Sequence, residues 1–142
     1  MMKLKDIFYD TILPGDQDLN LPAASRLEID DYMASVGATE MLARYLDLLD
    51  TLAHEKFNHG FVDLSAEDRL ACVTFSKRKD IRLSTAIIVN CLKSYYTCES
   101  VLNILPTGSV PPFPEGNVVE GDDWSILEDV YERGTIYRHI PE

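Results

Sequence analysis

The sequence predicts an all-α fold: a compact, single-domain helical bundle over residues 1–142, with a long Pro/Gly-rich loop before its C-terminal helix. Apolar residues recur at spacings of three and four in several segments, which is the periodicity of amphipathic helices. Residues that cap or stop helices bound these segments. The chain has 142 residues, of which 46% are hydrophobic and 26% charged, and this size and composition suit one globular domain.

Two short helices are expected in the N-terminal region. Residues 3–13 place Leu4, Ile7, Phe8, Thr11 and Ile12 on one face. Pro14 ends this helix because it disfavours helical geometry at the residue before it. Ser25 is expected to cap a second helix, with Glu28 completing a capping box. This second helix ends at Gly37, and its apolar residues are Leu27, Tyr32, Met33 and Val36.

The middle of the chain contains the strongest helical signals. The clearest helix covers residues 39–57, and its apolar stripe comprises Met41, Leu42, Tyr45, Leu46, Leu48, Leu49, Leu52, Ala53 and Phe57. Ser65 with Asp68 opens the next helix by the same capping logic, and its apolar residues are Leu70, Val73 and Phe75. Residues 81–97 follow as a helix with an apolar middle that suits the centre of a bundle. The β-branched run at 87–89 leaves a strand open as an alternative.

The C-terminal region differs in composition. Prolines and glycines interrupt residues 106–123, and a loop of this length in a small domain is typically functional or disordered. A last helix is expected to start near Asp122 and Asp123, since acidic residues favour a helix N-terminus. It ends at Gly134, and its apolar face comprises Trp124, Leu127, Val130 and Tyr131.

Composition excludes several classes of function. The net charge of −11 argues against general binding to nucleic acid and against docking on an anionic membrane surface. No apolar run reaches the length of a membrane span, and the N-terminus does not have the pattern of a signal peptide. A soluble, cytoplasmic protein without direct membrane insertion is therefore expected. Its three cysteines, without a CxxC, are expected to be buried free thiols.

No sequence motif marks a catalytic, cofactor-binding or metal-binding residue, so the chain is not expected to be an enzyme. The alternative is a small metal-dependent enzyme that uses His54, His59 and Asp63, but a spacing of five turns the two histidines away from each other on a helix. One basic patch exists, made of Lys77, Arg78, Lys79 and Arg82. A solvated face that complements the helix dipole is favoured there over an anion site.

The unusual apolar features predict a partner-binding surface. Aromatic and proline-rich surfaces are typical anchors of protein interfaces. The candidate partner-binding residues are Tyr95, Tyr96, Pro111, Pro112, Phe113, Pro114 and Trp124. The alternative is that the proline-rich loop folds back and Phe113 fills the domain's own core.

Four stretches, taken in order, resemble the small (third) subunit family of gluconate 2-dehydrogenase and related FAD-dependent sugar and polyol dehydrogenases. They are residues 10–16 with 22–24, residues 61–69, residues 95–97, and residues 111–116 with 123–133. The resemblance implies an all-helical accessory subunit that holds no cofactor and supports the folding, export or stability of a large subunit. The large subunit would hold FAD and carry out the oxidation, and a cytochrome would receive the electrons in some complexes.

The chain departs from this family in one respect. Many members begin with a twin-arginine export signal, whereas this sequence shows none. The expectation is a cytoplasmic location as given, or a periplasmic one if the chain is exported with a partner. The leading hypothesis is therefore a non-catalytic small subunit that binds and stabilises a large FAD-dependent dehydrogenase. The alternative is a stand-alone helical interaction module without an oxidoreductase partner.

Overall fold

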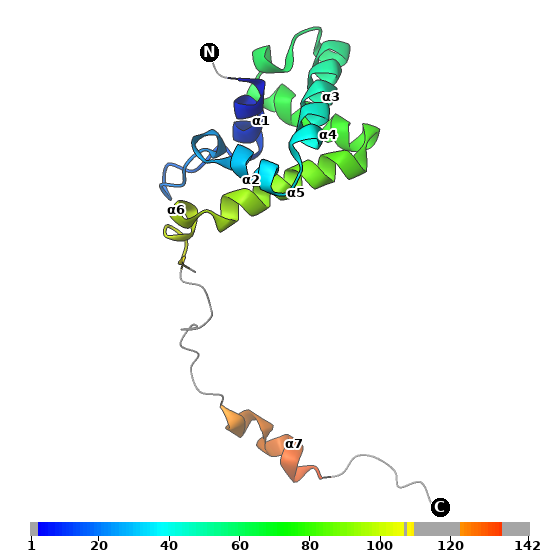
Figure 1. The fold of residues 1–142 in the computed structure, drawn as a ribbon. Helices are drawn as coiled ribbons and strands as arrows, with labels where there is room; N and C mark the ends of the chain where they lie inside the picture. Colours follow the sequence, from blue (N-terminus) through cyan, green and yellow to red (C-terminus); the bar gives the residue numbers. More distant parts are fainter. Residues whose placement is uncertain (1–2, 107, 110–122, 135–142) are drawn as a thin grey trace, which may run out of the picture. The chain divides into compact units, whose positions relative to one another are not determined.

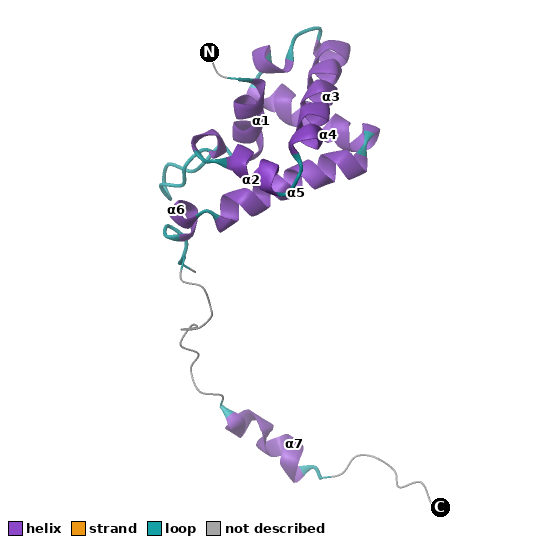
Figure 2. Ribbon diagram, in the orientation of Figure 1, coloured by secondary structure: helices purple, strands orange, loops and turns teal. Residues whose placement is uncertain are grey.

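The computed structural model describes residues 3–106, 108–109 and 123–134. The chain divides into two compact units, residues 1–109 and residues 110–142, and each is considered by itself. Helices joined by loops make up the described residues, which contain no strand beyond one isolated bridge between Asp16 and Leu21 (Figures 1 and 2). The predicted all-α fold class is confirmed.

Six α-helices belong to the described part of the first unit: α1 (Leu4–Ile12), α2 (Ile29–Ser35), α3 (Thr39–Phe57), α4 (Ala66–Lys79), α5 (Ile81–Thr97) and α6 (Glu99–Leu102). Two 3₁₀ turns lie between them, η1 (Ala24–Arg26) and η2 (Phe61–Asp63). The described part of the second unit has one 3₁₀ turn, η3 (Trp124–Leu127), and one helix, α7 (Glu128–Glu132). No helix in the described ranges combines the length and the apolar character needed to cross a membrane.

The helix α5 organises the first unit. It runs past α2, α3 and α4 in Figure 1, and it contacts all three as well as α6. Its inner face contributes Ile87, Cys91 and Tyr95 to the core, so the apolar middle predicted for this segment lies at the centre of the bundle. The largest fully buried side chains from the other elements are Phe8, Ile29, Met33, Tyr45, Leu49, Phe61 and Val101.

The helix boundaries agree with several predictions. The bounds of α3 and α5 coincide with the predicted segments 39–57 and 81–97. Ser65 caps α4 as expected, because its hydroxyl oxygen accepts a hydrogen bond from the Asp68 amide at 3.1 Å. Capping residues that lie close together in the sequence therefore predicted this helix start correctly.

The predicted capping box of Ser25 and Glu28 is wrong. The amide and the hydroxyl of Ser25 both donate to the carboxylate of Asp10, each at 2.8 Å. Helix α2 begins at Ile29, after Glu28, and no side chain caps it. Asp10 is fifteen residues away in the sequence, so local spacing could not reveal that it competes for Ser25.

The predicted apolar face of α4 is only partly correct. Val73 is buried, but Leu70 is 51% exposed. The core positions of this helix are instead Cys72, Val73 and Ser76. A serine is accepted in the core because a hydrogen-bond network satisfies its hydroxyl group.

This buried network joins three helices through Ser76. The Ser76 hydroxyl donates to the Val73 carbonyl oxygen at 2.7 Å. A hydroxyl has one hydrogen to donate, so Tyr45 of α3 and Ser84 of α5 donate to the Ser76 oxygen, at 2.9 and 3.2 Å. The network thus connects α3, α4 and α5 at the centre of the unit.

A polar cluster at the surface joins α1 to α2. The carboxylate of Asp30 accepts hydrogen bonds from the Tyr9 hydroxyl, at 2.9 Å, and from the Lys5 ammonium group. Burial opposes ionisation of Asp30, but these two hydrogen bonds outweigh it and lower the pKa of Asp30. The hydrogen bond with Asp30 raises the pKa of Lys5, so both members of the pair are charged near neutral pH.

The cysteines largely follow the prediction. Cys72 and Cys91 are buried free thiols, whereas Cys98 is half-buried at the junction of α5 and α6. Burial raises the pKa of Cys91 to about 12. Cys91 is therefore a protonated, apolar packing residue at neutral pH.

Candidate partner-binding surface

The two tyrosines near the end of α5 have different environments. Tyr95 is only 2% exposed, and its hydroxyl donates a hydrogen bond to the Pro22 carbonyl oxygen at 2.7 Å. The prediction that Tyr95 belongs to a partner-facing surface is therefore corrected: Tyr95 is a core residue. Its position toward the interior follows from its spacing of four from Cys91 on the buried face of α5.

Tyr96 is the exposed member of the pair. Its side chain is 47% exposed, and its ring packs edge-on against Tyr95 with a centroid separation of 5.1 Å and an interplanar angle of 78°. Edge-to-face contacts of this kind are favourable for aromatic rings. The fixed ring of Tyr95 thus supports one side of Tyr96 and leaves another side open to solvent.

A small pocket of about 190 Å³ adjoins Tyr96. It is lined by Ile12, Leu13, Pro14, Gly15, Asp16, Leu21, Tyr95 and Tyr96. The lining comes from the end of α1, the loop that follows it and the C-terminal part of α5. Residues far apart in the sequence therefore form one concave site.

The loop that lines this pocket has a defined backbone. Asp16 and Leu21 exchange backbone hydrogen bonds at 2.8 and 3.0 Å, and the Ala24 amide donates to the Leu13 carbonyl oxygen at 3.0 Å. Gly15 has a φ of +80°, and an added Cβ would lie 2.7 Å from both the Ala23 nitrogen and the Leu21 oxygen. Only glycine fits this close approach of two backbone segments without strain.

An exposed apolar stripe continues from Tyr96 along the outer side of α5. Val89, Leu92 and Tyr96 are all exposed, and spacings of three and four place them on one face. The inner face of the same helix is buried in the core. The outer side of α5 also exposes Arg82 and Lys93, so the apolar residues form a narrow stripe on it. Hereafter, Val89, Leu92, Tyr96 and the adjoining pocket are the Tyr96 surface.

Burial raises the pKa of the Tyr95 hydroxyl, and the neighbouring Tyr96 and Asp16 add to this rise. The hydroxyl therefore stays protonated at neutral pH and remains a donor to Pro22. This hydrogen bond fixes the loop against α5, so the Tyr96 surface is a preformed feature of the folded unit.

The C-terminal segment is a second place where apolar side chains are exposed. Asp123 caps η3 by accepting a hydrogen bond from the Ser125 amide at 3.1 Å, and Gly134 follows α7 with a φ of +69°. The predicted helix from near Asp122 and Asp123 to Gly134 is therefore only partly correct, because its first turn is the 3₁₀ turn η3 and the α-helix α7 covers only Glu128–Glu132. The exposed large apolar residues of this segment include Trp124 (63%), Ile126 (76%), Val130 and Tyr131. Within residues 123–134, no residue of η3 or α7 is buried.

The remaining predicted partner-binding residues lie outside the described residues. These are Pro111, Pro112, Phe113 and Pro114. Their participation in an interface, and the alternative that Phe113 packs in the core, stay predictions.

His54 and His59, the histidines among the described residues, do not form part of a recognisable metal site. The His54 Nε2 atom lies 3.6 Å from the Asp50 carboxylate, and the His59 Nδ1 atom is 2.8 Å from the Phe57 carbonyl oxygen. Across residues 3–106, 108–109 and 123–134, no group of three or more His, Cys, Asp or Glu side chains is placed to hold a metal ion. The described residues therefore provide no group of metal ligands that would support the hypothesis of a metal-dependent enzyme.

Comparisons of the chain with protein-family models, with curated proteins and with solved structures returned no match. A functional interpretation therefore depends on the geometry of the surfaces above and on the sequence stretches that resemble a known family.

Proposed function

We propose that this chain is a non-catalytic small subunit that binds and stabilises a large FAD-dependent sugar or alcohol dehydrogenase subunit, with the Tyr96 surface as its main contact. One observation supports this proposal above all. Two of the stretches that resemble the small-subunit family, residues 10–16 with 22–24 and residues 95–97, meet at the pocket beside Tyr96. The hydrogen bond between Tyr95 and Pro22 joins them across 73 positions of sequence.

The physical properties of the Tyr96 surface suit a protein partner. Tyrosine is enriched among the residues that contribute most to interface affinity. Tyr96 is held in place by Tyr95, so little side-chain entropy is lost when a partner covers it. The stripe formed with Val89 and Leu92 extends the contact along a rigid helix, which is a better platform than a loop.

In this proposal the chemistry resides in the partner. The large subunit holds FAD and oxidises the sugar or polyol, and a cytochrome is a further acceptor of electrons. The small subunit contributes by mass action, because a protein that binds only the folded form of its partner raises the stability of that form. This role requires no nucleophile, metal or cofactor in the small subunit.

A stand-alone interaction module is the second candidate function. The observation that favours it is the C-terminal segment, where Trp124, Ile126, Val130 and Tyr131 are exposed. A short aromatic and acidic segment is a general means of engaging a protein surface, and it does not require a flavoprotein. The two candidates differ in whether a flavin-containing chain accompanies the protein.

The experiment that tests the proposal is affinity isolation of the tagged full-length chain from the cells in which it naturally occurs. We expect a stoichiometric second chain with a flavin absorbance spectrum and with sugar or polyol dehydrogenase activity. We expect Tyr96→Ala to lower recovery of this chain at least about tenfold, equivalent to about 1.4 kcal/mol. The matched control is Leu70→Ala, which truncates a similarly exposed apolar residue on α4 and should leave recovery unchanged.

Two results would contradict the proposal. If the isolated protein carries a stoichiometric partner without flavin, the stand-alone interaction module is the better description. If Tyr96→Ala and Leu70→Ala have equal effects on recovery of a flavoprotein, the contact lies elsewhere. Trp124→Ala then tests whether the C-terminal segment supplies it.

A further inference from the structure

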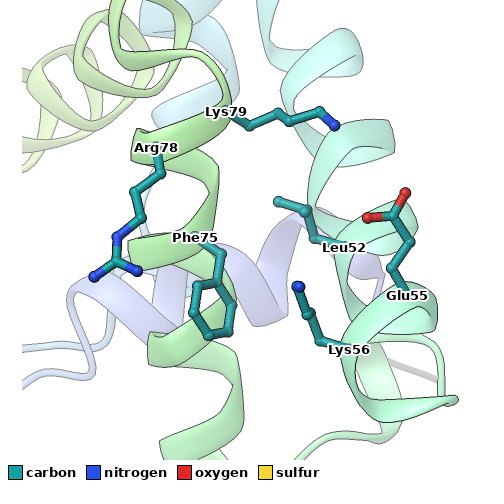
Figure 3. Close-up of a pocket in the computed structure, with 6 residues that line it drawn as sticks. All are labelled: Leu52, Glu55, Lys56, Phe75, Arg78 and Lys79. Carbon is teal, nitrogen blue, oxygen red and sulfur yellow. The ribbon is translucent and has the colours of Figure 1, made fainter.

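A second pocket lies between α3 and α4, outside the Tyr96 surface (Figure 3). Its volume is about 280 Å³, and it is lined by Leu52, Glu55, Lys56, Phe75, Arg78 and Lys79. Leu52 is buried and Phe75 is half-buried, whereas the four charged residues are exposed. The pocket therefore combines an apolar floor with a charged rim.

The rim is cationic on a chain whose net charge is −11. Lys56, Arg78 and Lys79 line the pocket together with a single carboxylate, that of Glu55. The ion pairs within the described residues join Lys5 to Asp30 and His54 to Asp50, so they involve none of these three cations. The C-terminal ends of α3 and α4 lie at the pocket, and their helix dipoles favour cations there.

The aromatic ring of the pocket floor lies close to the cations of the rim. The Lys56 ammonium nitrogen lies 5.8 Å from the centroid of the Phe75 ring, within the range of a cation–π contact. In Figure 3, the Phe75 ring is seen between the side chains of Lys56 and Arg78. The sequence favoured a solvated basic face here over an anion site, because it could not show that α3 adds Lys56 and an apolar floor.

We propose that this pocket, hereafter the Lys56–Arg78 pocket, binds an acidic peptide segment of a partner protein that inserts one apolar side chain against Phe75 and Leu52. Carboxylates on either side of that side chain pair with the cations of the rim. Charge complementarity identifies the occupant, since the rim carries three cations and one carboxylate. At physiological ionic strength, the negative charges elsewhere on the chain are largely screened beyond about 8 Å. The cations of the rim therefore dominate the electrostatic attraction of an approaching acidic peptide.

A peptide fits this pocket better than a small molecule. Sites for small ligands bury about 70–90% of the ligand surface, whereas four of the six lining residues here are exposed. A small anion would stay largely in water. A peptide buries one side chain in the pocket and gains further contacts along the exposed surfaces of α3 and α4.

The test uses the intact chain and two synthetic peptides in a fluorescence anisotropy titration. One peptide has phenylalanine flanked by aspartate and glutamate, and its twin replaces every acid by the corresponding amide. We expect the acidic peptide to bind at least about tenfold more tightly than its twin, a difference of about 1.4 kcal/mol. Phenylacetate in place of the peptide tests whether a small anion alone suffices.

Variants locate the binding on the protein. Phe75→Ala is expected to weaken binding of the acidic peptide about tenfold, and Phe75 lies outside the buried core cluster, so the variant should keep its helical circular dichroism. Arg78→Gln should weaken binding severalfold. The matched control is Lys77→Gln, which removes one charge from the adjacent, exposed position on α4 without lining the pocket.

Three outcomes would overturn the proposal. They are equal affinity for the acidic peptide and its amide twin, equal effects of Arg78→Gln and Lys77→Gln, and saturable binding of phenylacetate without binding of the peptide. None of them bears on the flavoprotein partner, because the Tyr96 surface and the Lys56–Arg78 pocket share no residue.

Discussion

Ser76 lies where α3, α4 and α5 meet, and Ser76→Ala is expected to destabilise the chain more than the loss of one small hydroxyl would indicate. Tyr45, Ser76 and Ser84 are all completely buried. The Ser76 oxygen accepts hydrogen bonds from Tyr45, at 2.9 Å, and from Ser84, at 3.2 Å. Its removal leaves two buried donors without their acceptor.

The magnitude follows from what each donor can do afterwards. An unsatisfied buried polar group costs about 1–3 kcal/mol. Ser84 has an alternative, because a helical hydroxyl can donate to a carbonyl one turn earlier, as Thr11 does to Ile7 at 2.7 Å. The Tyr45 hydroxyl reaches across to other helices and cannot use a carbonyl of its own helix, so after the substitution Ser84 is the hydroxyl left beside it. We therefore expect Ser76→Ala to lower the free energy of unfolding by about 2–4 kcal/mol.

Tyr45→Phe provides the comparison. It removes the donor and keeps the ring that packs edge-on against Phe8 at 5.2 Å. Ser84 still donates to Ser76, so no buried donor is orphaned. The expected loss is about 0.5–1.5 kcal/mol, the net contribution of one hydrogen bond.

The assay is urea unfolding of the wild type, the two single variants and the double variant. Because the double variant has no orphaned tyrosine hydroxyl, it should be more stable than additivity predicts by about 1–2 kcal/mol. Strict additivity would refute the reasoning. So would a larger loss for Tyr45→Phe than for Ser76→Ala, because the acceptor role of Ser76 would then be wrong.

Three further predictions concern other parts of the first unit. Gly15→Ala should lower the free energy of unfolding in urea by at least about 1–2 kcal/mol, since left-handed backbone geometry alone costs a non-glycine residue that much. An unchanged midpoint of the urea transition would contradict this, because it would show that the loop rearranges freely. Asp30→Asn should cost about 1 kcal/mol at pH 7, a modest value because the Asp30 side chain is 46% exposed. The folded-state pKa of Asp30 is lowered, so its contribution is present above the unfolded-state pKa of about 3.9 and is lost as the pH falls below it. Unfolding curves of wild type and Asp30→Asn should therefore differ by a constant amount from pH 5 to 8 and converge below pH 4, whereas a difference that persists in acid would contradict the assignment. Leu49→Ala should lower the free energy of unfolding by about 2–5 kcal/mol in thermal or urea unfolding. Leu46→Ala should lower it clearly less, because Leu49 is completely buried and Leu46 is only partly buried. Equal losses for the two variants would mean that the buried face of α3 is assigned wrongly.

The long helices could be predicted from sequence because their signals are local. The bounds of α3 and α5 and the capping of α4 by Ser65 depend on residues within a few positions of one another. The failures depend on distant partners. Ser25 donates hydrogen bonds to Asp10 and does not cap a helix. Ser76 can occupy a core position because Tyr45 and Ser84 form hydrogen bonds with its hydroxyl group.

In the candidate site, too, local signals could be predicted from sequence and contacts between distant residues could not. Sequence reasoning identified Tyr95 and Tyr96 as an unusual pair but did not separate the inward ring from the outward one. The spacing of four from Cys91 to Tyr95 on α5 carries that signal, whereas the contact of Tyr95 with the Pro22 carbonyl oxygen, 73 positions away, could not be read from sequence. Arg78 and Lys79 were recognised in sequence as part of a basic patch, but the pocket itself was missed, because its other half, including Lys56, comes from a different helix.

The Tyr95–Pro22 hydrogen bond has a consequence for the order of assembly. It spans 73 positions, so a nascent chain that lacks α5 has neither Tyr96 nor the pocket beside it. A partner that recognises the Tyr96 surface would therefore bind only chains in which α5 has packed against this loop. At a partner concentration one hundred times the dissociation constant, such binding adds about 2.7 kcal/mol to the stability of the folded chain. Partner binding would then favour copies of the chain in which this long-range contact has formed.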